Sequence, residues 1–177
     1  EYAYKESKRV IDEHVETTPD KWKLYLEDGC EMDSLKIHSE CIDAVFTSPP
    51  YYGQPEPYNT DTRDLCNMSI EDFDKRIDVM MGNISRLIKK SDHKNKRYYP
   101  IIFVVGTYRN KDEGIYDMDN SFQNIAKNHG TKVTHIKPHG ALNNMACEDL
   151  SLAKILAETI YGIDKNLIYL VPTGSKM

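Results

Sequence analysis

A short apolar run that ends in two prolines places the strongest constraint on the fold of this chain. Residues 44–46 are apolar and predict a buried strand, which Pro49 and Pro50 follow almost at once. Because proline has no N–H group, the strand cannot continue through these residues as a hydrogen-bonded ladder. In a sheet with helices on its faces, a strand end of this kind is where ligands usually bind.

Helices and further strands are expected to alternate around this run. Residues 69–90 carry hydrophobic side chains at helical spacing behind a serine cap, and residues 117–128 and 150–161 are two further expected helices. Strands are expected at residues 22–26, 99–108, 133–136 and 167–171. The alternation predicts an α/β fold with a mostly parallel sheet of about five strands and helices on both faces.

Composition limits the classes of function. The chain has 177 residues, of which 40% are hydrophobic and 29% charged, which is typical of one globular domain. Its net charge of −5 does not favour binding to phosphates. Four cysteines without metal-ligand spacing predict reduced thiols, with no metal site and no disulfide framework. No stretch reaches the length of a membrane span, so we expect a cytoplasmic protein with no membrane partner.

The residues after the first strand suit recognition of an exocyclic amine. The Ser48 hydroxyl and the Pro49 carbonyl offer two neighbouring acceptors, and the Tyr51 ring could stack on a planar base. Thr47-Ser48-Pro49-Pro50-Tyr51 resembles the catalytic motif of the S-adenosylmethionine-dependent DNA amino-methyltransferases. The alternative is a Pro-Pro turn that simply closes a strand.

This first resemblance, over residues 21–130, implies methyl transfer to adenine N6 or cytosine N4, with DNA as partner and S-adenosylmethionine as cofactor. It implies catalytic roles for Ser48, Pro49, Pro50 and Tyr51. Three further residues are candidates: Asp28 for binding the cofactor, and Tyr52 and Arg109 for lining the site. The glycine-rich turn that binds the cofactor in these enzymes is absent, so an incomplete enzyme is expected.

A second resemblance begins near residue 131. The segment from Thr134 to Ala146, with Lys-Pro-His-Gly-Ala-Leu at its centre, is similar to the signature of the LamB/YcsF family, the A subunits of 5-oxoprolinase. That family acts with partner subunits in the ATP-dependent opening of 5-oxoproline to glutamate, on a β/α-barrel-like fold. His139 is a candidate base or ligand, and Lys137 is a candidate for holding a carboxylate. The alternative is a strand-end turn with a satisfied histidine.

Together the patterns predict an N-terminal helix or tail over residues 1–20, a methyltransferase-like segment over 21–130 and a 5-oxoprolinase-like segment over 131–177. The two segments are expected to pack into one domain, with a join near residues 126–130. A DNA methyltransferase is the main interpretation of the function. A 5-oxoprolinase component and an inactive composite α/β protein are the alternatives.

Overall fold

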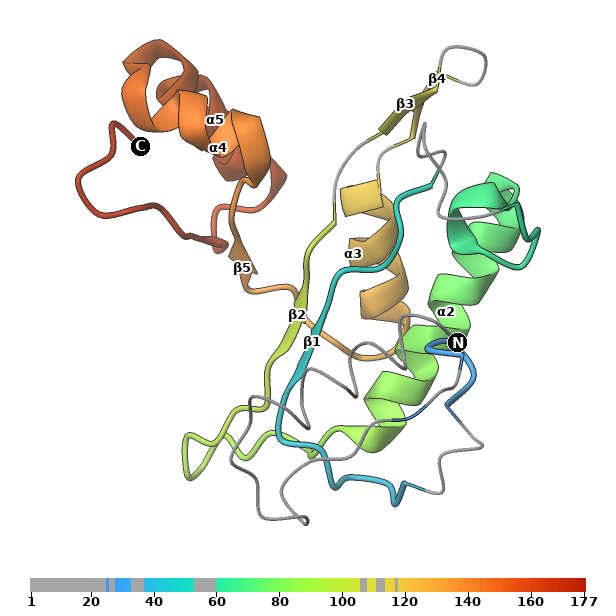
Figure 1. Ribbon diagram of the computed structural model, residues 1–177. Helices are drawn as coiled ribbons and strands as arrows, with labels where there is room; N and C mark the ends of the chain where they lie inside the picture. Colours follow the sequence, from blue (N-terminus) through green and yellow to red (C-terminus); the bar gives the residue numbers. More distant parts are fainter. Residues whose placement is uncertain are drawn as a thin grey trace, which may run out of the picture.

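Two helices and two short parallel strands form the main body of the protein, and a second unit follows at the C-terminus (Figure 1). The computed structural model describes residues 25, 28–32, 37–52, 60–105, 108–110, 114–116 and 118–177. The expected N-terminal helix and the strand expected at residues 22–26 lie almost wholly outside these residues. No helix in the described part is long and apolar enough to span a membrane.

The longest helix, α2 (Ile70–Leu87), supplies most of the core. The Ser69 hydroxyl accepts a hydrogen bond from the Asp72 N–H at 3.1 Å and so caps its first turn. Helix α3 (Met118–Asn128) packs on α2. Both helices begin within a residue or two of the predicted positions. The hydrophobic side chains predicted to face inward are buried, namely Phe73, Ile77, Met80, Met81, Ile84, Leu87 and Ile88 on α2 and its end, and Phe122 and Ile125 on α3.

Within the described residues, the main body holds a sheet of two strands. Strand β1 (Val45–Thr47) pairs in parallel with β2 (Ile101–Phe103). Alternate side chains, including Val45 and Phe103, pack on the helical core, whereas Phe46 and Ile102 lie on the opposite face and are exposed. Helices therefore cover one face of this sheet within the described residues, and the prediction of helices on both faces is not confirmed.

A hairpin and a second parallel pair complete the strands. Strand β3 (Tyr108–Asn110) pairs antiparallel with β4 (Gly114–Tyr116). Strand β5 (His135–Ile136) pairs in parallel with β6 (Ile168–Tyr169). The described strands thus form three separate two-stranded sheets, and the predicted mostly parallel sheet of about five strands is not confirmed. Prolines explain why the parallel strands are short, since Pro49, Pro100, Pro138 and Pro172 stand close to their ends and cannot donate to a ladder.

The C-terminal unit has the order β5, α4 (Gly140–Glu148), α5 (Leu150–Ile163) and β6, and its two helices pack on each other. Helix α5 spans the predicted range and is capped by Asp149, whose carboxylate accepts from the Ser151 and Leu152 N–H groups. Helix α4 was not predicted. Figure 1 shows this unit, in orange and red, beside the upper part of the main body.

Candidate active site

The end of β1, where base recognition was expected, is largely engaged in holding the fold together. The Ser48 hydroxyl donates to the Val104 carbonyl at 3.3 Å, tying the end of β1 to the segment after β2. Pro49 is buried and Pro50 is half-buried. Tyr51 is half-buried and packs against the hydrophobic core.

Tyr52, expected to line the same site, lies inside the protein. Its side chain is 4% exposed, and its ring meets Phe73 edge to face at 5.8 Å between centroids. Arg109 lies in the middle of β3, opposite Ile115 of β4. The side chain of Arg109 is outside the described part of the structure.

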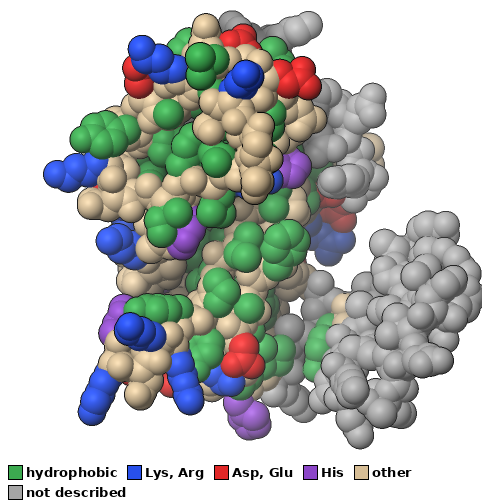
Figure 2. All heavy atoms as spheres, turned by 90° about the vertical axis from the view of Figure 1, so that its left-hand side faces the viewer, with side chains coloured by type: hydrophobic (Ala, Val, Ile, Leu, Met, Phe, Trp, Pro, Cys, Tyr) green, Lys and Arg blue, Asp and Glu red, His purple; other side chains and the backbone are tan. Residues whose placement is uncertain are grey.

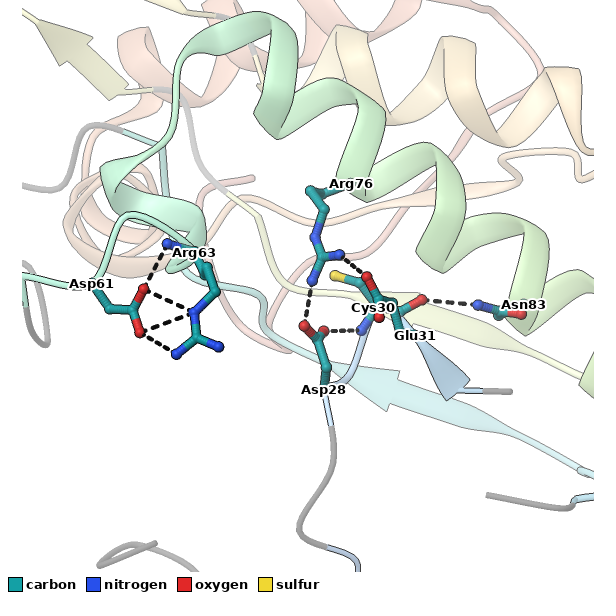
Figure 3. Close-up of polar contacts among 7 residues, drawn as sticks. All are labelled: Asp28, Cys30, Glu31, Asp61, Arg63, Arg76 and Asn83. Atoms are coloured by element: carbon teal, nitrogen blue, oxygen red, sulfur yellow. Dashed lines mark hydrogen bonds and ion pairs between the residues drawn. The ribbon is translucent and has the colours of Figure 1, made fainter. Parts of the chain in front are cut away.

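Asp28, expected near a cofactor, is part of an ion-pair cluster on α2 (Figure 3). One carboxylate oxygen accepts from the Cys30 N–H at 2.8 Å, and the other pairs with Arg76. Arg76 also pairs with Glu31 at 2.5 Å, and Figure 3 shows its guanidinium between the two carboxylates. Burial raises the pKa of the neighbouring Cys30 thiol, and the Asp28 charge raises it further. The cluster fastens residues 28–31 to α2.

A second set of predicted residues lies where β5 ends. Lys137, Pro138 and His139 form the turn from β5 into α4, and the Lys137 and His139 side chains are exposed. Neither side chain has a hydrogen-bond or ion-pair partner among the described residues. The structure therefore places an exposed ammonium group and an exposed imidazole in the same turn.

The same turn carries the start of α4, which the sequence patterns did not reveal. His139 is the N-cap residue, yet its side chain makes no capping hydrogen bond. Gly140 follows with φ +64°, a conformation that glycine adopts without steric cost. The first N–H groups of α4 lack a side-chain cap and carry the positive end of the helix dipole, which favours anions. Ala141, Leu142, Met145 and Ala146 favour a helix, but Asn143 and Asn144 between them weaken that signal.

The two strand ends are not brought together. Strand β1, which the Ser48 to Tyr51 segment follows, belongs to one two-stranded sheet. Strand β5, which Lys137 and His139 follow, belongs to another. They therefore do not share an edge of one continuous sheet. What the arrangement at β5 defines is a strand-to-helix turn, in a β-α-α-β unit, with two exposed groups suited to binding a carboxylate and moving a proton.

This part of the chain matches a known family. The model of the LamB/YcsF family matches residues 107–177, which include β3, β4 and α3 as well as the C-terminal unit. The match begins upstream of residue 131 and so overlaps the end of the segment that resembled the methyltransferases. The division of the chain at residues 126–130 stays a prediction.

Two of the curated relatives are A subunits of 5-oxoprolinase. The chain is 46% identical over 57 residues to the A subunit of 5-oxoprolinase from Rhodopseudomonas palustris (strain BisB18), covering 32% of this chain and 22% of the relative. It is 44% identical over 66 residues to the A subunit of 5-oxoprolinase from Natranaerobius thermophilus, covering 37% of this chain and 25% of the relative. The chain thus spans about a quarter or less of these relatives.

These similarities correct the main functional prediction. The family model and the relatives point to the A subunit of 5-oxoprolinase, so the DNA methyltransferase prediction is wrong. The prediction of S-adenosylmethionine as the cofactor is wrong for the same reason. DNA as the partner has no support. The methyltransferase prediction failed because the Ser-Pro-Pro-Tyr motif is short and can also occur in a turn that closes a strand. Here the Ser48 hydroxyl is bonded to the backbone and Tyr51 packs on the core, so the motif closes a strand.

Proposed function

We propose that this chain acts as the A-type component of a 5-oxoprolinase, working with partner subunits in the ATP-dependent hydrolysis of 5-oxoproline. The observation that carries the proposal is the turn at the end of β5. It presents Lys137 and His139 without protein partners in the described part of the chain, next to an α4 N-terminus that lacks a side-chain cap. The turn lies within the residues that match the family.

The chemistry of the substrate suits these groups. 5-Oxoproline is a cyclic amide that carries one carboxylate. The Lys137 ammonium and the first N–H groups of α4 would hold that carboxylate, because both are positively polarised. Hydrolysis breaks the ring C–N bond; the oxygen of water joins the carbonyl carbon and a proton reaches the nitrogen. The His139 imidazole would take up and return the proton in this step.

Activity should depend on both side chains of the turn. The chain is mixed with the partner subunits of a 5-oxoprolinase, ATP and 5-oxoproline, and glutamate formation is followed. We expect His139→Gln to lower the rate by roughly 10²–10⁴-fold through loss of proton transfer. Lys137→Ala should chiefly raise KM, since it removes a contact to a part of the substrate that does not react.

Matched control variants separate the site from a general effect of charge. His93→Gln and Lys94→Ala change an exposed histidine and an exposed lysine in the loop after α2, and they should leave the rate unchanged. If the chain forms no glutamate with any partner subunits, or if the control variants lower the rate as much as the site variants do, the proposal fails. The inactive composite protein would then be the better account.

A further inference from the structure

A second histidine, His135, lies in β5 just before the turn that carries Lys137 and His139. Strand β6 holds β5 in place, because the Ile168 N–H donates to the Thr134 carbonyl at 2.9 Å. The His135 side chain is exposed. Figure 2 faces the side of the molecule on which the C-terminal unit lies, and it shows histidine side chains at the surface there, among hydrophobic ones. The hydrolysis described above does not use the His135 imidazole.

The chain from His135 to His139 is extended, so its exposed side chains alternate with covered ones. Lys137 precedes a proline, which disfavours a helical conformation, and His139 has φ −127° and ψ 160°. Ile136 and Pro138 are half-buried, whereas His135, Lys137 and His139 are exposed. Because successive side chains of an extended chain point to opposite sides, the ammonium group lies between two imidazoles on one side. Neighbouring groups of this row are about 6–7 Å apart along the chain.

The neighbouring threonine holds the His135 ring in one orientation. Thr134 Oγ1 and His135 Nδ1 are 2.8 Å apart, within hydrogen-bond distance. A neutral imidazole carries one N–H group, and a hydroxyl group can either donate or accept. When the Thr134 hydroxyl donates to Nδ1, the ring proton is on Nε2, at the outer end of the ring. His135 then presents an N–H donor on the same side of the chain as the Lys137 ammonium.

A carboxylate bound at Lys137 can accept hydrogen bonds on both of its oxygens. The first N–H groups of α4 lie on the His139 side of Lys137, and His135 lies on the other side. We propose that His135 is a further substrate-binding residue, whose Nε2–H donates to the second oxygen of the substrate carboxylate and so turns the lactam toward His139. The site is then specific for lactams that carry a carboxylate beside the ring nitrogen. This role of His135 rests on the proposed function.

Titration of the full chain with two related lactams tests the role of His135. One is 5-oxoproline, and the other is 2-pyrrolidone, which has the same ring without the carboxylate. His135→Leu removes the N–H donor and should weaken 5-oxoproline binding roughly 10- to 100-fold, as expected for a hydrogen bond to a charged group. His135→Gln keeps an amide N–H near the place of Nε2 and should restore most of the affinity. 2-Pyrrolidone should bind weakly and equally to all three proteins.

The matched control is His38→Leu, which changes an exposed histidine of the main body and should leave the affinity for 5-oxoproline unchanged. With partner subunits and ATP present, His135→Leu should raise KM for 5-oxoproline and leave kcat nearly unchanged, because the carboxylate does not react. A merely structural role for His135 would give neither this split between KM and kcat nor the difference between the two lactams.

The orientation of the His135 ring is tested on the full chain without partner subunits. Long-range ¹⁵N–¹H spectra, recorded where the ring is neutral, should show the proton on Nε2. Thr134→Val keeps the branched side chain but removes the hydroxyl, and it should weaken 5-oxoproline binding roughly 2- to 10-fold, the loss of a neutral hydrogen bond. Thr159→Val is the matched control, since the Thr159 hydroxyl donates to the Ile155 carbonyl within α5 at 2.8 Å, and it should not change the affinity.

Three results would overturn the role of His135: a proton on Nδ1 of the neutral ring, equal affinity of His135→Leu and the unchanged chain for 5-oxoproline, or an equal loss in His38→Leu. If the unchanged chain does not bind 5-oxoproline, the role of His135 and the proposed function fail together. If His135→Leu loses affinity as expected but the chain forms no glutamate with any partner subunits, the role of His135 stands and the proposed function alone fails.

Discussion

At the scale of single residues, the side chains beside the prolines after β1 and after β5 differ in whether they contact the protein or stay exposed. After β1 the polar and aromatic side chains turn to the protein itself, with Ser48 bonded to Val104 and Tyr52 buried against Phe73. After β5, Lys137 and His139 remain exposed. The sequence predicted both turns, because proline cannot donate a hydrogen bond to the ladder of a sheet. It could not predict which turn would face solvent, because that depends on packing against distant residues.

Asp61 offers a residue-scale test of the electrostatics. Its hydrogen bonds with the Arg63 side chain and N–H hold the pKa of its carboxyl at about 2. We expect Arg63→Gln to raise this pKa toward 3.8, though not fully, since the N–H of residue 63 remains. Side-chain carboxyl resonances followed against pH measure it.

The direction of the effect on stability follows from the lowered pKa. A carboxyl group whose pKa is depressed by folding stabilises the protein above its unfolded pKa, and this contribution is lost as the pH falls toward 2. Asp164 is the internal control, because its pKa is lowered by Asn166 and should not respond to Arg63→Gln. An unchanged Asp61 pKa in the variant would contradict the assignment.

At the scale of elements, helices were predictable and strands were less so. The hydrophobic stripe and the serine cap predicted the start of α2 to within a residue, because both signals are local, whereas the helix ends three residues before the predicted end. The run from Tyr99 to Tyr108 predicted one long strand, but only Ile101–Phe103 pairs with β1, and residues 108–110 turn back into a hairpin. Pairing depends on a partner strand, and β1 ends before its prolines. Hydrophobic runs do not carry that information.

The end of α3 gives a prediction at this scale. Gly130 has φ +71°, and the Thr131 N–H donates to the Ala126 carbonyl at 2.9 Å to close the helix. Gly130→Ala should lower the free energy of unfolding by about 1 kcal/mol, because a Cβ atom is disfavoured at positive φ. Denaturant unfolding measures the change.

Gly29→Ala is the matched control for this substitution. Gly29 lies in a turn without a positive φ, and a Cβ atom there would meet nothing within 4 Å. We expect a change within about 0.5 kcal/mol. Equal destabilisation by the two substitutions would show that the left-handed conformation at Gly130 is not the cause.

At the scale of the whole molecule, the described residues form two small α/β arrangements in sequence, and their strands lie in separate two-stranded sheets. The main body has its core between α2, α3 and one face of β1–β2, and the C-terminal unit holds the exposed turn and much of the family match. A mixture of strands and helices was correctly predicted, but the hairpin β3–β4 and the helix pair α4–α5 interrupt the expected alternation. Assembly into one sheet was not confirmed, because alternation fixes the order of elements and not their pairing. The choice between the two resemblances needed comparison with relatives.

Titration of the full chain with 5-oxoproline, followed by amide resonances, tests the central claim most directly. The account predicts shifts concentrated at Lys137 to Asn143 that saturate and are lost in Lys137→Ala, while S-adenosylmethionine causes none. Shifts at Ser48 to Tyr52 with S-adenosylmethionine, and none near Lys137 with 5-oxoproline, would contradict it.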